Sequence, residues 1–318
     1  MLKRVLPLSL IFIISGCAHS SKDEISVKSF EKIKGYTEVS ETRLDADGAN
    51  GEDTYTLIRN AFGPRSIEAP DLYGSANHQG HPHITELTDP KIGDYFKFVL
   101  HRDLDHDRDV LSKSDRQRNE IKVYGRSDSS LKGYLGKTFE YRWKFRINDD
   151  LKVTRHFTHI FQLKAVKKSG SDALTNSPIL TLTANIRHGR SGLEVRHVGY
   201  NSDHSGTINN TLYHTSKHNV DWQDDIKGRW FEVFVRANYA EQGNLMMTVT
   251  PVGETTPLIE VHENNIEMWR SGNDANKGNF VRPKWGIYRS LKAKEQLNAT
   301  EDEVDFANFE VKEVKPVY

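Results

Sequence analysis

Cysteine is almost absent from this sequence, and so is net charge. Cys17 is the only cysteine in 318 residues, so the chain forms no internal disulfide and needs a hydrophobic core. The 44 Lys and Arg residues balance 44 Asp and Glu residues. Without an overall basic field, the chain is not expected to bind nucleic acid, and affinity for a polyanion must come from a local cluster of basic side chains.

The sequence also lacks a hydrophobic run long enough for a permanent membrane-spanning helix. Its most apolar stretch, Val5 to Ile14, is short and follows two basic residues, Lys3 and Arg4. A basic start followed by a short apolar stretch predicts a signal peptide over residues 1–16.

The signal peptide ends in Ile14-Ser15-Gly16-Cys17, which resembles the bacterial lipobox. This resemblance implies that Cys17 is lipidated and becomes the new N-terminus, and Ala18 after it implies the outer membrane. The alternative is an ordinary free or buried cysteine. The polar residues 17–50 are then a tether with marginal structure. We expect an exported monomer that is held on the membrane by its lipid.

Alternation of apolar and polar residues dominates the chain from Tyr55 onward and predicts half-buried strands. In the run Thr138 to Ile147, Phe139, Tyr141 and Trp143 share one face. The similar runs cover 95–102, 118–124, 157–164, 179–186, 193–198, 230–237, 245–252, 258–262, 285–289 and 304–311. The only helical pattern lies near 264–269. This predicts an all-β domain over residues 51–318, a β-jelly roll (a concanavalin A-like sandwich of two sheets) with a concave groove.

Three strands carry the polar residues that suggest chemistry. In the first, Arg118, Glu120 and Lys122 share one face. In the second, Gln162 and Lys164 share one face, and alternation places His159 on the other face with the core, unless a β-bulge near Ile160 turns it towards the groove. In the third, Lys284, Gly286 and Tyr288 share one face, where the glycine leaves room for a ligand.

These segments resemble, in order, the three motifs of the jelly-roll alginate lyases: Arg-x-Glu, Gln-Ile-His and Tyr-x-Lys-x-Gly-x-Tyr. Arg118-Asn119-Glu120 matches the first motif, Gln162-Leu163-Lys164 the second with Lys in place of His, and the segment 284–288 the core of the third. The third segment also resembles heparin lyase I, and a Lys/Tyr pair resembles the ulvan lyases of this fold. Arg282 replaces the first Tyr of the third motif. The resemblance therefore implies β-elimination on a uronic-acid polysaccharide, with alginate not the default substrate.

The chemistry of elimination assigns roles to these residues. Arg118 and Gln162 would neutralise the uronate carboxylate, with Glu120 orienting the arginine. Tyr288 would be the catalytic acid, and Lys164 the base with His159 in reserve. The remaining substrate-binding candidates are Lys284, Arg289, Asn119, Lys122 and His83, with His81 and His101 as further groove candidates.

No cofactor is required by this chemistry. Asp103, Asp105 and Asp107 have the spacing that begins a calcium-binding loop, although the turn glycine and terminal glutamate of that motif are missing. The spacing alone therefore predicts a structural calcium ion at these three aspartates.

Two other functions remain open at this point. A surface protein that binds anionic polysaccharide without cleaving it would need no acid and base. A glycoside hydrolase of the lectin-like sandwich type would need two facing carboxylates. The sequence leaves open which uronate polysaccharide is cut, whether it is sulfated, and whether cleavage is internal or from an end.

Overall fold

The computed structural model describes residues 34–318 except 73–77, 79, 109, 111 and 273–278. The predicted signal peptide and Cys17 lie outside the described residues. Among the described helices, none has the length and apolar character needed to cross a membrane. The chain divides into two compact units, Met1–Thr37 with Pro316–Tyr318 and Glu38–Lys315. The candidate site lies in the second unit.

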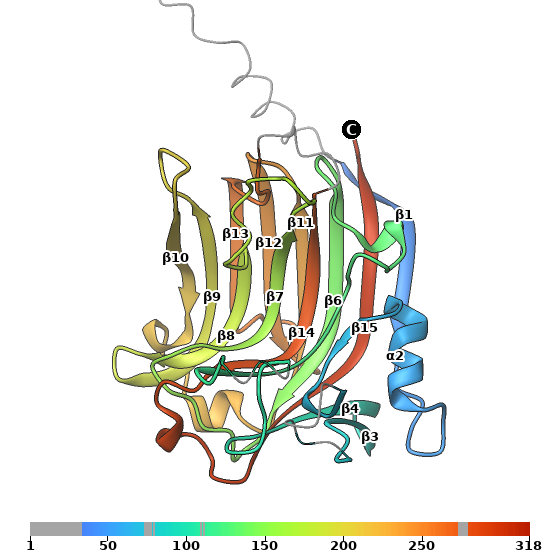
Figure 1. Ribbon diagram of the computed structural model, residues 1–318. Helices are drawn as coiled ribbons and strands as arrows, with labels where there is room; N and C mark the ends of the chain where they lie inside the picture. Colours follow the sequence, from blue (N-terminus) through green and yellow to red (C-terminus); the bar gives the residue numbers. More distant parts are fainter. Residues whose placement is uncertain (1–33, 73–77, 79, 109, 111, 273–278) are drawn as a thin grey trace, which may run out of the picture. The chain divides into compact units, whose positions relative to one another are not determined.

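Two antiparallel sheets make up the second unit (Figure 1). Within the described residues, the eight-stranded sheet has the order β13 (Ile259–Ile266), β12 (Gly243–Pro251), β11 (Trp230–Asn238), β6 (Thr138–Ile147), β15 (Glu301–Val317), β4 (Gly93–His101) and β3 (Ile84–Asp89), with β1 (Gly35–Leu44) also pairing with β15. The seven-stranded sheet has the order β10 (Thr207–His214), β9 (Arg190–Tyr200), β8 (Leu180–Arg187), β7 (Thr158–Val166), β14 (Phe280–Ser290), β5 (Arg116–Lys122) and β2 (Ile67–Glu68). The helices are α2 (Thr54–Phe62), η1 (Pro70–Leu72), η2 (Ser129–Leu131), η3 (Thr215–Lys217), η4 (Trp222–Ile226) and η5 (Lys294–Gln296).

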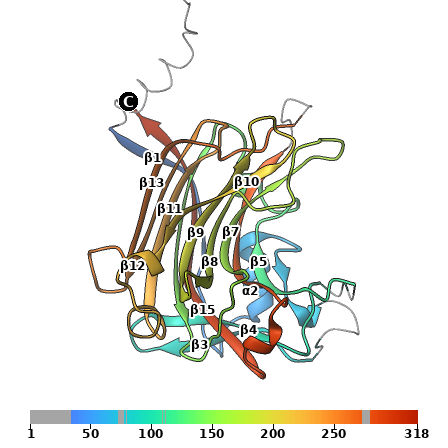
Figure 2. The same ribbon diagram turned by 90° about the vertical axis from the view of Figure 1, so that its left-hand side faces the viewer.

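The hydrophobic core lies between the two sheets, which Figure 2 shows as separate layers. Strand β6 alternates as predicted, with Tyr141 and Trp143 buried. The Trp143 ring lies 4.4 Å from the ring of Phe161 on β7 and 6.0 Å from that of Trp285 on β14, between ring centroids. These contacts join the facing sheets and confirm the predicted two-sheet sandwich.

The helix α2 was not predicted, because its residues were assigned to the region of strands. The Asp53 side chain accepts a hydrogen bond from the Thr56 backbone N–H at 2.9 Å and caps the helix. Ile58 and Phe62, one helical turn apart, are its buried residues. The helix predicted near 264–269 is also wrong, since residues 264–266 end strand β13.

Strand β1 lies inside the segment predicted to be a tether of marginal structure. Of its residues only Leu44 is buried, so hydrophobicity gave no signal for this strand. Within the second unit, it pairs with β15. Ion pairs join Arg43 to Glu310 at 2.7 Å and Glu41 to Lys312 at 3.1 Å. The tether prediction is therefore wrong for this stretch.

Strand β14 pairs with β5 on one side and β7 on the other, and this register brings the polar residues together. Tyr288 lies opposite Arg118 on β5 and opposite His159 on β7. The pairing of β7 with β8 shifts between His159 and Phe161, and both Ile160 and Phe161 belong to the core. The bulge at Ile160 therefore places His159 on the side of the sheet that carries Tyr288 and is turned away from the core. The predicted burial of His159 is confirmed, since the residue is 3% exposed, but the bulge turns it towards Tyr288 instead of the core between the sheets.

Candidate active site on the polar face of the seven-stranded sheet

The polar face is the side of β5, β14 and β7 turned away from the core. Trp285 and Ile287 on β14 are buried in the core, so Lys284 and Tyr288 lie on the opposite face. Ion pairs that join Arg118, Glu120 and Lys284 confirm the predicted sharing of faces on β5 and β14. A glycine at position 286 was expected to leave room for a ligand, but the structure gives a different reason for it. Its φ is +137°, and a Cβ there would lie 2.1 Å from the backbone oxygen of Asn119, so the glycine allows close approach of β5.

A buried ion-pair network lies at the centre of this face. Lys284 Nζ donates to Glu68 Oε2 at 2.7 Å and to Glu120 Oε2 at 2.5 Å, and Lys122 Nζ donates to Glu68 Oε1 at 2.5 Å. Burial alone would raise the pKa of Glu68, but Lys284, Arg118 and Lys122 hold that pKa well below its usual range. Lys284 is 1% exposed. The substrate-binding prediction for Lys284 is therefore at odds with the structure, because its ammonium is enclosed by two carboxylates.

Arg118 is also engaged by carboxylates. Its Nη1 donates to Glu120 Oε2 at 2.7 Å and its Nε to Asp107 Oδ1 at 2.8 Å, so Glu120 does contact the arginine that it was predicted to orient. Gln162 Nε2 donates to the other oxygen of Glu120. The two groups predicted to hold a substrate carboxylate are thus already bound to Glu120.

Tyr288 lies beneath this arginine and is half-buried. The Arg118 guanidinium carbon is 3.8 Å from the centroid of the Tyr288 ring, and the Tyr288 hydroxyl accepts a hydrogen bond from Arg116 Nη1 at 3.0 Å. Burial raises the pKa of Tyr288 and outweighs the opposite effect of Arg118 and Arg116. At neutral pH the side chain is therefore a neutral phenol that can donate a proton.

His159 faces Tyr288, with the ring centroids 5.8 Å apart. Its Nδ1 is 2.8 Å from the Thr183 hydroxyl, which itself donates to Thr181 Oγ1 at 2.9 Å. Thr183 therefore accepts from His159, which places the proton on Nδ1. The other ring nitrogen, Nε2, is 3.5 Å from Arg196 Nη2, and a guanidinium can only donate. Both contacts assign the lone pair to Nε2.

The surroundings of His159 also keep it uncharged. Burial, followed by the charges of Arg196 and Lys164, lowers the pKa of His159 well below its ordinary value. A neutral imidazole whose lone pair has only a long contact, 3.5 Å from Arg196 Nη2, can accept a proton, and the phenol opposite can donate one. The arrangement can therefore remove a proton from one side of a ligand and deliver a proton to a leaving group nearby.

Lys164 lies on the same face but far from Tyr288. Its partner in the register is Arg282, six residues along β14 from Tyr288, which is about 20 Å at 3.3 Å per residue. Lys164 Nζ donates to the backbone oxygen of Asn176 at 2.8 Å. Burial, then Lys284 and Arg118, lower the pKa of Lys164 to about 7. Arg118, Lys164 and Tyr288 thus share a face, with the Lys164 backbone towards the far end of β14 and its charge still contributing to the lowered pKa of His159.

Three predicted substrate-binding residues lie elsewhere. The Asn119 side chain donates to the backbone oxygens of His83 at 2.7 Å and Val99 at 3.0 Å. Arg289 donates through Nε to Gln117 at 3.0 Å and also contacts Asp302. His83 is completely buried. Their substrate-binding predictions are therefore at odds with the structure, since these side chains are occupied away from the polar face.

The three aspartates proposed for calcium have different partners. Asp103 is exposed and pairs with Arg102 and Lys294, whereas Asp107 pairs with Arg118. Two groups in the described part of the chain could hold a metal ion, one of His78, His83, His101 and Asp105 and the other of His81, His101 and Glu301. Neither includes Asp103 or Asp107, so the geometry gives no support for calcium bound by these three aspartates.

Sequence reasoning missed Glu68, Arg116 and Arg196. Alternation could have found Arg116, which is two residues from Arg118, and Arg196, which alternates with Glu194 on β9. Glu68 lies on the two-residue strand β2 and gave no signal. Beside it opens a cavity of about 510 Å³. The basic residues that line the cavity are Arg59, Arg65, Arg108, Lys122 and Arg282.

Comparisons with known proteins identify the fold. No family model and no curated protein matches the sequence. Among solved structures, the chain is similar to the endo-β-1,4-glucuronan lyase of the fungus Trichoderma reesei, with 16% identity, a TM-score of 0.51 and coverage of 87% of this chain and 95% of that one. It is also similar to the PL-14 alginate lyase of Aplysia kurodai (12%, 0.52, 86% and 98%). A third similar structure is a variant alginate lyase in complex with an alginate tetrasaccharide (12%, 0.53, 88% and 99%). The chain has the jelly-roll fold of these structures.

Proposed function

We propose that this protein is a polysaccharide lyase that cleaves a uronic-acid-containing polysaccharide by β-elimination. The observation that carries the proposal is the pair formed by His159, with its lone pair on Nε2, and the phenol of Tyr288, whose rings lie 5.8 Å apart among three arginines. The alginate and glucuronan lyases that share the fold act on polymers of uronates, as their names state, which supports the choice of substrate class.

In the proposed reaction, His159 Nε2 takes the C5 proton of a uronate. The electron pair of that C–H bond forms the C4–C5 double bond, and the C4–O bond to the next sugar breaks. Tyr288 donates its proton to the departing oxygen. His159 replaces Lys164 as the proposed base, because acid and base must act on one sugar and the register places His159 directly opposite Tyr288, whereas it places Lys164 opposite Arg282.

The carboxylate on C5 must be neutralised while the proton leaves. Arg196 is suited to this, because it is half-buried and its Nε has no hydrogen-bond partner among the described residues. A guanidinium can bind a carboxylate through two parallel hydrogen bonds. Arg116, which holds the Tyr288 hydroxyl, would orient the acid. Arg118 would fix the Tyr288 ring rather than bind the sugar.

Other cations along the face would bind neighbouring units of the chain. Lys164 lies towards the opposite end of β14, and the basic cavity beside Glu68 adds further arginines. Their positions suit a polymer with repeated negative charges.

We also propose that the protein is exported, lipidated at Cys17 and held as a monomer on the bacterial outer membrane. Cys17→Ala should release it from membranes into the soluble fraction.

A panel of polysaccharides tests the proposed function. The purified protein is incubated with glucuronan, ulvan, heparin-type chains, pectin and alginate, while the ultraviolet absorbance of unsaturated uronate ends is followed. We expect the absorbance to rise with at least one of them. Cleavage without this absorbance would instead indicate a hydrolase. Binding without cleavage would indicate a carbohydrate-binding protein.

A further inference from the structure

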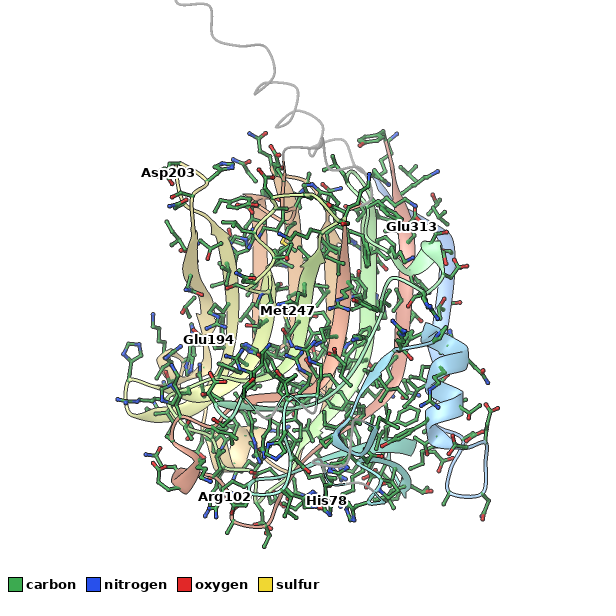
Figure 3. All side chains as sticks on the ribbon, viewed as in Figure 1. His78, Arg102, Glu194, Asp203, Met247 and Glu313 are labelled. Carbon is green, nitrogen blue, oxygen red and sulfur yellow. The ribbon has the colours of Figure 1, made fainter. Side chains whose placement is uncertain are left out.

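Histidines gather around one buried carboxylate at the ends of β3 and β4. His83 precedes β3, His101 ends β4, and Asp105 follows in the next turn. His78 completes the group, and Figure 3 shows it at the lower edge of the view near these strands. One ligand atom from each of the four lies within 4.8 Å of the others. We propose that His78, His83, His101 and Asp105 bind a divalent transition-metal ion, which we expect to be zinc.

The spacing of the donor atoms fits such an ion. Asp105 Oδ1 is 2.9 Å from His83 Nε2 and 3.6 Å from His78 Nδ1, and Asp105 Oδ2 is 3.3 Å from His101 Nδ1. Zinc bonds of about 2.1 Å in tetrahedral geometry place the donor atoms about 3.4 Å apart. The two distances from Asp105 Oδ1 lie on either side of that value, and the distance from Asp105 Oδ2 to His101 is close to it. The rings of His78, His83 and His101 are also nearly perpendicular to one another, at 81°, 82° and 89°.

Two of these nitrogens are otherwise unexplained. Nδ1 of His78, His83 and His101 are all buried without a hydrogen-bond partner among the described residues, which is costly for a polar atom. Of the three, Nδ1 of His83 lies 3.1 Å from Asp71 Oδ1, which leaves Nδ1 of His78 and Nδ1 of His101. If His83 were protonated, its two N–H groups would pair with Asp105 and Asp71. Nδ1 of His78 and Nδ1 of His101 would still have no hydrogen-bond partner in the described part of the chain. A metal ion would be a partner for both Nδ1 atoms at once.

The outer contacts of the histidines are those of metal ligands. His83 presents its other nitrogen, Nδ1, to Asp71 Oδ1 at 3.1 Å, and Tyr55 donates to Asp71 Oδ2 at 2.7 Å. His101 presents Nε2 to Glu301 Oε2 at 3.2 Å. Metal-bound histidines commonly donate their second N–H to a carboxylate, which fixes the tautomer and the ring. Two of the three histidines have such a partner.

The donor set selects the metal and its role. Three imidazoles and one carboxylate suit zinc, whereas calcium prefers oxygen ligands throughout. Four protein ligands close the site, so the ion would be structural. Gln117 Nε2 on β5 donates to the backbone oxygens of His101 and Asp105 at 2.8 and 2.9 Å. The same turn leads to Asp107, which holds Arg118. The ion would therefore fix the turn that positions Arg118 over Tyr288.

Metal content tests this proposal separately from the proposed activity. We expect the full-length protein, purified without chelator, to hold about one equivalent of zinc per chain by mass spectrometry. After removal of the metal, we expect a lower melting temperature that zinc restores, and cobalt should give the visible absorption of a tetrahedral ion. His101→Gln should lose the ion, whereas His106→Gln, in the same turn but outside the group, should keep it.

The cobalt spectrum keeps the test decisive if His101→Gln does not fold, because it needs only the wild-type chain. A wild-type protein that holds no metal, and binds neither zinc nor cobalt with any change in melting temperature, would overturn the proposal. So would equal zinc content in both variants.

Discussion

At the scale of single residues, His159 owes its proposed role to its neighbours. Thr183 fixes the proton on Nδ1, and Arg196 approaches Nε2 as a donor. Sequence reasoning named His159 and Tyr288 but ranked Lys164 above His159. Alternation shows which residues share a face, and it does not give their order along the groove. The pairing of β7 with β14 supplied that order.

Tyr288→Phe removes the proton that the proposed acid donates. We expect turnover to fall about 100-fold or more, with the melting temperature nearly unchanged, because among the described residues the hydroxyl has one hydrogen bond, from the half-buried Arg116. Tyr134→Phe, which alters a half-buried tyrosine near Phe280, is the matched control and should remain fully active. Full activity in Tyr288→Phe would remove Tyr288 from the mechanism.

Variants of His159 and Lys164 should separate catalysis from binding. His159→Gln keeps a polar side chain but not a base, and we expect kcat to fall by about 100-fold or more. Lys164→Met keeps the length of the side chain without its charge, and we expect KM to rise while kcat changes little. Steady-state kinetics on the best substrate measures both. The reverse pattern would restore Lys164 as the base.

The pH profile should reflect the lowered pKa of His159. The neutral imidazole is the active form, so activity should persist as pH falls and be lost only when His159 becomes protonated. Because its pKa is lowered, the acid limb of kcat/KM should lie below the ordinary histidine value of about 6.5. An acid limb above that value in the wild-type enzyme would contradict a buried, neutral His159.

At the scale of elements, the close approach of β14 to β5 depends on Gly286. Gly286→Ala would place a Cβ 2.1 Å from the Asn119 backbone oxygen at a φ of +137°. We expect a loss of about 3 kcal/mol in the free energy of unfolding, measured by chemical denaturation. Gly125 has no heavy atom within 4 Å of such a Cβ, so Gly125→Ala is the control and should change stability little. Equal stability of the two variants would refute the steric explanation.

Most core strands could be predicted from alternation. Strand β1, the bulge at Ile160 and the role of Glu68 could not, each for its own physical reason. The range predicted for β6 matches the structure because its apolar residues all face one way. Strand β1 was missed because pairing and ion pairs hold it in place with one buried residue. The bulge at Ile160 adds a residue that alternation alone cannot locate, since Ile160 and Phe161 are both apolar and both buried. Glu68 was missed because its strand has two residues.

At the scale of the whole molecule, the absence of net charge leaves substrate attraction to local cations. We expect the affinity for an anionic polysaccharide to weaken as salt rises, because exposed charges are screened over about 8 Å at physiological ionic strength. Tyr288→Phe allows the dissociation constant to be measured without cleavage, and a neutral polysaccharide is the control. Affinity that is independent of salt would argue against charge recognition.

The enclosure of Lys284 by Glu68 and Glu120 affects how a bound sugar would be oriented on the polar face. At the centre of the polar face, carboxylates balance the positive side chains, so this region would attract an anion only weakly. Among the described residues, Arg196 and Lys164 form no ion pair with a carboxylate, and the pKa of about 7 leaves Lys164 partly charged at neutral pH. A bound uronate chain would then rest its hydroxyl-bearing side on the neutral centre and turn its acid groups outward, so the pattern of these cations would decide which spacing of acid groups is accepted.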